Sequence, residues 1–263
     1  MARGSGTLLF MALLMAAAPA ALAQTTMTWT IDGVQRQALV FAPGPATNAH
    51  KLPLVFAFHG HGGTMQTAAQ GMHLETFWPG AIVVYPQGLK TPSRVDPQGN
   101  NFGWQTHAGQ TGLNDRDLKF FDVMVVTMRE KFPVDDARIY ATGFSNGAIF
   151  SYLLWAERGK TLAAFGIVAG RLDPAEHLTL PRSAVVIGGK NDNVLPFAWQ
   201  QQSINLALQV DNTTSPGQPC GPICTFYSST TQTPVVTRIH DGGHIYPPWA
   251  ASAIVAFLKL HKL

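Results

Sequence analysis

The feature that most constrains this chain is a serine between two glycines, at the junction of a predicted strand and a predicted helix. The serine is Ser145, within Gly143–Gly147; residues 138–142 are typical of a strand and residues 148–155 of an apolar helix. A strand that turns directly into a helix holds the intervening side chain in a strained, exposed position, and small neighbours allow the close approach. We therefore predict that Ser145 is a nucleophile. The alternative is an ordinary turn in which Ser145 caps the helix.

Strand and helix patterns alternate along the rest of the chain. An N-terminal hairpin is predicted over residues 29–42, with Asp32-Gly33 at its turn. Further strands are predicted at 52–58, 81–85, 137–142, 163–169, 183–188 and 234–239. Helices are predicted at 65–77, 115–131, 146–158, 197–210 and 248–261. This order predicts an α/β fold with a mostly parallel central sheet and helices on both faces.

The N-terminus has the pattern of a secretory signal peptide. Arg3 precedes an apolar stretch at 8–18, and Ala21-Leu22-Ala23 is a small-x-small cleavage pattern. We assign residues 1–23 to the signal and residues 24–263 to one catalytic domain, extracellular or periplasmic, with no membrane contact in the mature form. Removing Arg3 lowers the formal charge from +3 to +2, and no basic stripe indicates a nucleic-acid partner.

A serine hydroxyl needs a base to take its proton, and His244 is the favoured candidate. It follows the predicted strand 234–239 on a glycine-containing loop, whereas His240 falls inside that strand and His177 and His261 lack such a position. The imidazole in turn needs an orienting acid.

Asp192 is the favoured acid, because it follows the strand 183–188 and because the order serine, acid, histidine is the one that this architecture uses. Asp173 also follows a strand and stays as an alternative, and Asp241 adjoins the histidine loop.

The negatively charged oxygen of the reaction intermediate needs two backbone N–H donors. Asn146, directly after the serine, is one candidate, and His61 in the glycine-rich stretch His59–Gly63 is the other. A metal site at His59 and His61 is the weaker interpretation, since no third ligand is positioned nearby. We predict no metal and no cofactor.

Cys220 and Cys224 enclose a turn-forming Gly-Pro-Ile spacer and are predicted to form a disulfide that pins a local loop. Two thiolates alone would not complete a zinc site. The glycine- and proline-rich segment 88–113 is predicted to be a pocket wall, with Phe102 and Trp104 as apolar contributors. Aromatic residues near the expected active-site loops are candidates for substrate binding, although ordinary packing is the better explanation for each one taken singly: Trp104, Phe197, Trp199, Tyr246 and Trp249.

Several stretches together indicate a family resemblance: Pro53–Gly60, Val84–Gly88, Trp104, Asp117–Phe120, Arg138–Gly147 and Gly243-His244. In these stretches the chain resembles the secreted esterases related to bacterial polyhydroxybutyrate depolymerases and type C feruloyl esterases. The resemblance implies an α/β-hydrolase fold, a triad of Ser145, Asp192 and His244, and an oxyanion hole at His61 and Asn146. This chain departs from the family pattern around the pocket: a cysteine-containing stretch after Trp104 is absent, Arg116 precedes Asp117, and His61 stands where cysteine or glycine is usual.

The expected function is that of a secreted serine carboxylesterase acting on feruloyl or other hydroxycinnamoyl esters, with a plant cell-wall or polyester polymer as the expected source of the ester. A polyhydroxyalkanoate depolymerase and an acetylxylan esterase are the alternatives within this chemistry. A serine peptidase on the same fold is a further rival. Outside enzymology, the rival is a polymer-binding protein without turnover.

Overall fold

The computed structural model describes Met1, residues 22–44 and residues 50–263. Residues 2–21 of the predicted signal peptide lie outside the described residues, and Ala23, its last residue, begins the first strand. Within the described ranges, no helix is long and apolar enough to cross a membrane.

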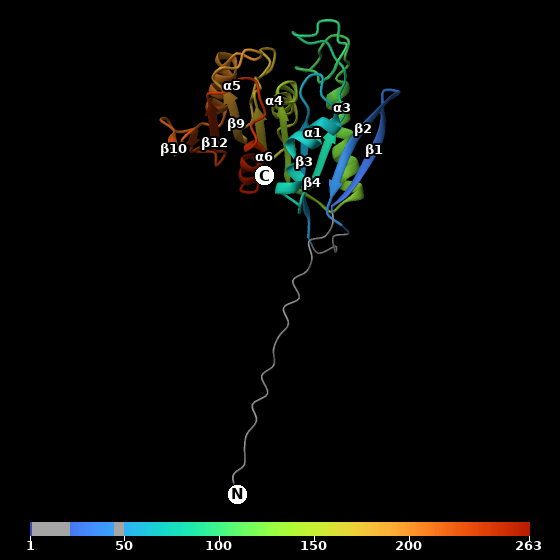
Figure 1. The fold of residues 1–263 in the computed structure, drawn as a ribbon, viewed down its shortest axis with the longest axis horizontal. Coiled ribbons are helices and arrows are strands. Elements are labelled where there is room, and N and C mark those ends of the chain that lie inside the picture. The colour runs from blue at the N-terminus through green and yellow to red at the C-terminus, as the bar shows by residue number, and fades with distance from the viewer. Residues whose placement is uncertain (2–21, 45–49) are drawn as a thin grey trace.

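Ten strands within the described residues form the main sheet, which runs from β1 at one end to β10 at the other (Figure 1). In spatial order they are β1 (Ala23–Ile31), β2 (Val34–Ala42), β4 (Ile82–Pro86), β3 (Leu52–Phe58), β7 (Val134–Phe144), β8 (Ala164–Val168), β9 (Ser183–Gly189), β12 (Val235–His240), β11 (Cys224–Tyr227) and β10 (Gln218–Gly221). The strands from β4 to β12 are parallel to one another, and the pairs at both ends are antiparallel. The predicted mostly parallel sheet is confirmed.

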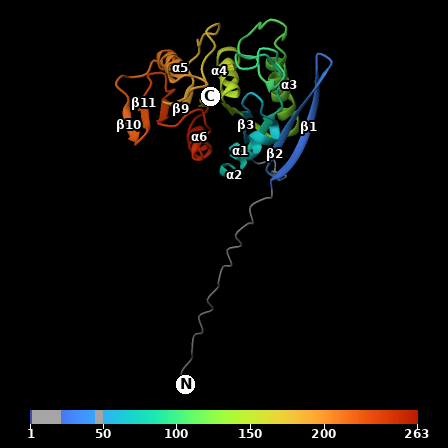
Figure 2. The ribbon, with the colours of Figure 1, turned by 45° about the horizontal axis from the view of Figure 1, so that its top comes forward.

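Helices cover both faces of this sheet, as Figure 2 shows. One face packs against α1 (Met65–Met72), α2 (Leu74–Phe77) and α6 (Ala250–Leu258). The other face packs against α3 (Arg116–Lys131), α4 (Asn146–Arg158) and α5 (Phe197–Val210). The central strands are almost completely buried because both of their faces are covered, which explains their continuous apolar sequences.

The predicted N-terminal hairpin is present and longer than expected. Strands β1 and β2 pair over their whole length, and Asp32 and Gly33 form the two-residue turn with φ values of 49° and 79°. Positive φ at both turn residues matches the right-handed twist of the flanking strands, which is why an Asp-Gly pair is favoured there.

Three local features differ from the sequence prediction. The helix expected at 65–77 is broken at His73, which takes the left-handed conformation with φ of 46° and separates α1 from α2. The segment 88–113 carries two short paired strands, β5 (Leu89–Lys90) and β6 (Phe102–Gly103). Strands β10 and β11 form a further hairpin that periodicity did not reveal, and the disulfide between Cys220 and Cys224 closes its turn with a Cα–Cα distance of 4.9 Å.

Candidate active site

Ser145 occupies a sharp turn between the last residue of β7 and the first residue of α4. Its φ and ψ angles are 55° and −118°, a combination that costs free energy for any residue other than glycine. The turn is packed tightly against neighbouring backbone. A Cβ atom on Gly147 would lie 2.2 Å from the carbonyl oxygen of Phe58, and one on Gly143 would lie 2.3 Å from Gly147. Glycine is therefore required at both positions, because neighbouring backbone lies too close to leave room for a side chain.

A continuous set of hydrogen bonds joins Ser145, His244 and Asp192. The Oγ atom of Ser145 lies 2.7 Å from Nε2 of His244, and Nδ1 of the same ring lies 2.7 Å from Oδ2 of Asp192. The His244 side chain is 13% exposed and that of Asp192 is fully buried, so water reaches only the histidine end. The structure therefore brings together the three residues that the sequence analysis selected.

Both oxygens of the Asp192 carboxylate are held by further donors. Oδ1 accepts hydrogen bonds from the backbone N–H groups of Val194 and Leu195 at 2.9 and 2.8 Å. Oδ2 accepts from Nε2 of Gln200 at 2.9 Å as well as facing His244. These donors stabilise the ionised carboxylate and fix its orientation toward the imidazole. The sequence did not indicate that Gln200, on α5, would bind this carboxylate.

The loops that carry the acid and the histidine leave adjacent parallel strands. Register pairs His240 at the end of β12 with Gly189 at the end of β9. Beyond the strands, Lys190 N–H donates to the carbonyl of His240 at 2.9 Å, and Asn191 N–H donates to that of Gly242 at 3.1 Å. The two loops thus support each other, because the carboxyl ends of parallel strands meet at one edge of the sheet.

The competing acids and base lie elsewhere. Asp241 forms an exposed ion pair with Lys190, with Oδ1 and Nζ 2.8 Å apart. Asp173 faces His107, with Oδ2 and Nδ1 3.8 Å apart. His240 ends β12 and packs edge-on against Trp249. Of the candidate acids, Asp192 is the one in contact with His244.

The glycine-rich loop after β3 passes directly beside the serine. A Cβ atom on Gly60 would lie 3.4 Å from Cβ of Ser145. The backbone N–H of Gly62 donates to Phe102 and that of Gly63 to Gly60, whereas within the described residues no acceptor is bonded to the N–H of His61. The N–H of Asn146 belongs to the first helical residue of α4 and has no acceptor within the helix. Two unused backbone donors therefore stand beside Ser145.

His59 holds this loop from the inside. Its Nε2 accepts the backbone N–H of Gly88 at 3.0 Å, and its Nδ1 lies 2.8 Å from the carbonyl of Gly60, so the neutral ring donates from Nδ1. Burial lowers the pKa of His59 to about 4, which keeps the ring neutral at ordinary pH. The side chain of His61 is anchored separately, with Nε2 3.1 Å from Oδ2 of Asp96.

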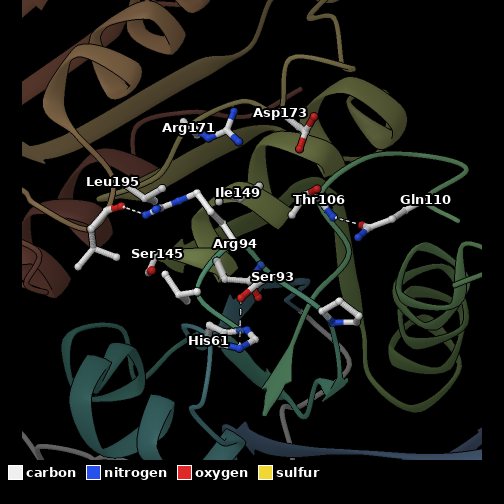
Figure 3. A pocket seen from close by; sticks show the side chains of 14 residues that line it. His61, Ser93, Arg94, Thr106, Gln110, Ser145, Ile149, Arg171, Asp173 and Leu195 are labelled. Atoms are coloured by element: carbon white, nitrogen blue, oxygen red, sulfur yellow. Dashed lines mark hydrogen bonds between the residues drawn. The ribbon is translucent and has the colours of Figure 1, made fainter. Parts of the chain in front are cut away.

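A cavity of about 350 Å³ opens at Ser145 (Figure 3). Its walls combine the apolar side chains of Ile149, Val194 and Leu195 with the guanidinium groups of Arg94 and Arg171. The remaining lining residues are His61, Pro92, Ser93, Val95, Thr106, Gln110, Ser145, Asn146 and Asp173. Sequence analysis missed both arginines, since they lie in irregular loops where no periodicity indicates direction.

Trp104 is not a pocket wall. It is fully buried, its Nε1 donates to the carbonyl of His59 at 3.0 Å, and its ring stacks on Phe150 with centroids 5.3 Å apart. The side chain of Asn146 binds the backbone of Trp104 on both sides, with Oδ1 accepting its N–H at 2.7 Å and Nδ2 donating to its carbonyl at 3.1 Å. Trp104 therefore supports the glycine-rich loop after β3 and the serine turn.

The other aromatic candidates also lie outside the residues that line the Ser145 cavity in the described chain. Trp199 lines a neighbouring depression beneath Arg94 and Arg171. Tyr246 packs edge-on against Phe144 and lines a separate cavity of about 260 Å³ behind the glycine-rich loop. Trp249 packs against β12. These residues were predicted to bind substrate because they are close in sequence to the active-site loops. Closeness in sequence does not determine the direction of a side chain.

The parallel sheet, the helices on both faces and the strand–turn–helix at Ser145 define an α/β-hydrolase fold. No protein-family profile matches the chain. The chain is 27% identical over 240 residues to a probable feruloyl esterase C of Aspergillus clavatus, covering 84% of this chain and 80% of that one.

Two solved structures have the same fold. An acetyl xylan esterase from Aspergillus awamori superposes with a TM-score of 0.66 at 14% identity, covering 89% of this chain and 99% of that one. A ferulic acid esterase from Anaeromyces mucronatus gives a TM-score of 0.60 at 16% identity, covering 91% and 90%. These two structures share the fold of the chain. The contacts among Ser145, His244 and Asp192, taken with the sequence relative, make the chain a carboxylic ester hydrolase.

Proposed function

We propose that this protein is a serine esterase that forms an acyl-enzyme at Ser145. The observation that carries the proposal is the unbroken contact from Ser145 Oγ through His244 to Asp192, with both hydrogen bonds at 2.7 Å. A binding protein without turnover has no need of a strained serine turn aligned on an imidazole and a buried carboxylate.

The geometry supports a two-step reaction. Ser145 Oγ attacks the ester carbonyl carbon while His244 Nε2 takes the hydroxyl proton, and Asp192 stabilises the resulting imidazolium. The N–H groups of His61 and Asn146 are the donors for the negatively charged oxygen. Collapse of the tetrahedral intermediate breaks the carbon–oxygen bond, and His244 gives its proton to the departing alcohol.

Water completes the cycle by the same route. His244, now neutral, takes a proton from water as the water oxygen attacks the acyl carbon. The second tetrahedral intermediate releases the carboxylic acid, and the proton returns to Ser145 Oγ. The net reaction is ester plus water to acid plus alcohol, and every proton passes through His244.

We infer that hydroxycinnamoyl esters, such as feruloyl esters, are the substrates. Support comes from the relative named as a feruloyl esterase and from the partly apolar cavity of about 350 Å³ beside Ser145. An acetylated polysaccharide is a second candidate, because a protein named as an acetyl xylan esterase shares this fold over 89% of the chain. The polyhydroxyalkanoate substrate suggested by sequence resemblance stays a prediction.

The decisive experiment compares Ser145→Ala with wild type on methyl ferulate. We expect kcat to fall at least about 10⁴-fold, because the nucleophile is removed while the fold is kept. Ser151→Ala is the matched control. Ser151 lies on α4, the helix that follows Ser145, and its Oγ donates to the carbonyl of Gly147. Undiminished hydrolysis by Ser145→Ala would refute the proposal.

Two further measurements separate the rivals. A panel of methyl ferulate, a short hydroxyalkanoate ester and acetylated xylan ranks the substrate classes, and a matched ester and anilide pair distinguishes an esterase from a peptidase. Labelling by an organophosphate, located by mass spectrometry, tests the binding-protein alternative. An adduct on Ser145 supports turnover chemistry, and its absence supports the binder.

Export is a separate proposal. We propose that cleavage after Ala23 releases a mature chain outside the cytoplasm, on the strength of the charged, apolar and small-residue pattern at the N-terminus. Expression in a bacterial host followed by N-terminal sequencing of the exported protein tests it. A mature N-terminus at Gln24 supports the assignment, whereas retention of Met1 in the cell contradicts it.

A further inference from the structure

Two arginines from distant parts of the chain converge on the cavity that opens at Ser145. Arg94 comes from the irregular segment after β5, and Arg171 follows β8. Both line the same cavity as Ser145 and are among the side chains drawn in Figure 3. Arg94 is exposed and Arg171 is half-buried, so both guanidinium groups are accessible to a ligand that enters the cavity.

Neither guanidinium is paired with a carboxylate within 4.0 Å in the described part of the chain. Arg94 donates one hydrogen bond, to the carbonyl of Val194 at 2.6 Å. Arg171 donates one at 3.3 Å, to the carbonyl of Leu172, and its buried Nε has no acceptor among the described residues. Since each guanidinium carries five N–H donors, most of them are free for a ligand.

The indole ring of Trp199 lies beside both arginines. The Cζ atoms of Arg94 and Arg171 lie 5.6 and 5.4 Å from the centroid of its indole ring. Stacking on an indole restricts two otherwise flexible side chains without using their N–H donors. Two positive charges therefore lie beside the same indole ring and repel each other. An anion between or beside them would relieve that repulsion.

One carboxylate lines the cavity, that of Asp173. Its Oδ1 accepts the backbone N–H of Ala175 at 3.1 Å, and its Oδ2 lies 3.8 Å from Nδ1 of His107. Asp173 is therefore directed to other partners and does not form an ion pair with either arginine. The charged side chains lining the cavity leave an excess of one positive charge.

We propose that Arg94 and Arg171 select ester substrates that carry a free carboxylate in addition to the ester group. This inference rests on the proposed esterase function of Ser145. The carboxylate could be carried by the acyl part, as in a half-ester of a dicarboxylic acid, or by the alcohol part, as in an ester of a hydroxy acid. In both cases the guanidinium groups bind it through charge-assisted hydrogen bonds, for which arginine geometry is well matched.

Matched pairs of substrates test the proposal. For the acyl source, 4-nitrophenyl hydrogen glutarate is compared with 4-nitrophenyl methyl glutarate. For the alcohol source, the feruloyl ester of lactic acid is compared with that of methyl lactate. We expect wild type to prefer the charged member of at least one pair by about tenfold or more in kcat/KM, and the preferred pair identifies the source. Raising ionic strength should reduce this preference.

Variants assign the preference to the arginines. In Arg94→Met and in Arg171→Met, the ratio of kcat/KM for the charged ester to that for its neutral partner should fall about threefold, and in the double variant it should fall to near one. Asp173→Asn should raise the ratio, because it removes a negative charge from the cavity. Arg238→Met is the matched control: Arg238 also stacks on an indole, that of Trp249, but lies outside the cavity lining and should leave the ratio at the wild-type value.

The outcomes separate this inference from the proposed function. A wild-type ratio near one for both pairs, or a ratio that the arginine variants leave unchanged while thermal unfolding shows a folded protein, overturns the carboxylate selection. If hydrolysis of the neutral esters still depends on Ser145, the esterase assignment stands regardless. Loss of the preference in the arginine variants with retention in Arg238→Met supports the inference.

Discussion

At the scale of single residues, the chemistry depends on how firmly Asp192 is held. Val194, Leu195 and Gln200 donate to its two oxygens, so the carboxylate reaches His244 in one orientation. This orientation keeps Nδ1 of His244 facing Asp192 and leaves Nε2 facing the serine hydroxyl, as transfer of the serine proton to Nε2 requires.

Asp192→Asn should therefore lower kcat about 10⁴-fold, because an amide can donate to Nδ1 of His244 and favour the wrong tautomer. Steady-state kinetics on methyl ferulate measures this, with thermal unfolding as the check on folding. Asp241→Asn is the control: it removes an exposed carboxylate, three residues before His244, that forms an ion pair with exposed Lys190. Equal losses in the two variants would contradict the assignment of Asp192.

Residue positions were predictable where the backbone alone determines them. Ser145, Asp192 and His244 each follow a parallel strand, and such strands deliver the residues that follow them to one edge of the sheet. Trp104 and Arg171 could not be located in this way. Their side-chain directions depend on tertiary contacts of irregular segments, with Trp104 bound by Asn146 and Arg171 resting on Trp199.

At the scale of elements, the serine turn works only because α4 starts against the end of β3. The contact between Gly147 and the carbonyl of Phe58 leaves no space for a methyl group. Gly147→Ala should lower the free energy of unfolding by about 3 kcal/mol, because either the helix or the strand must shift. Any shift also moves Ser145 relative to His244, so activity should fall with stability.

Urea unfolding measures that effect against Gly71→Ala as a control. Gly71 is exposed on α1, and a Cβ atom there meets nothing within 4 Å. Since alanine is the better helix former, Gly71→Ala should stabilise the protein by about 0.5–1 kcal/mol. A Gly147→Ala variant as stable and active as wild type would show that the close approach is not required.

Elements with long periodic patterns were predictable, and short ones were not. The boundaries of α4 and α5 agree with the prediction because a polar or glycine residue ends each apolar pattern. The break between α1 and α2 was missed, since His73 carries no sequence sign of a left-handed conformation. The pair β5 and β6 is only two residues long per strand, too short for an alternating pattern.

At the scale of the whole molecule, a buried ion pair connects the N-terminal hairpin to the active-site side of the sheet. Arg36 on β2 lies 2.9 Å from Asp117 on α3, and both side chains are almost completely buried. Asp117 also accepts the backbone N–H of Gln105 at 2.9 Å, next to Trp104. The sequence analysis missed this pair, because Arg36 and Asp117 are 81 residues apart in the sequence.

Asp117→Asn should lower the free energy of unfolding by about 3 kcal/mol, because it leaves a buried guanidinium without a counter-charge. Burial already lowers the pKa of Arg36, which shows how unfavourable its environment is for an unpaired charge. Asp32→Asn is the control, since Asp32 also joins the hairpin to α3, through exposed Lys119 at 2.6 Å, and its loss should cost less than about 1 kcal/mol. Chemical denaturation that finds equal costs would contradict the importance of burial.

The pH dependence of stability should reveal the buried His59. Its pKa is about 4 in the folded protein and 6.5 as a free side chain, because burial disfavours the charged ring. Between these values the unfolded chain binds a proton that the folded chain excludes, so this residue's contribution to stability is complete above pH 6.5 and is lost as the pH falls toward 4. Linkage gives a loss of about 2 kcal/mol between pH 7 and pH 5.

His59→Gln removes that proton while keeping an acceptor for the N–H of Gly88, so its stability should fall about 2 kcal/mol less than that of wild type over the same interval. His50→Gln, at an exposed position, is the control and should follow the wild-type curve. Urea unfolding at both pH values measures the difference, and parallel curves for His59→Gln and wild type would mean that the ring is not neutral in the folded state. Because His59 supports the loop that carries His61, protonation that loosens the fold should also reduce the turnover of methyl ferulate in acid.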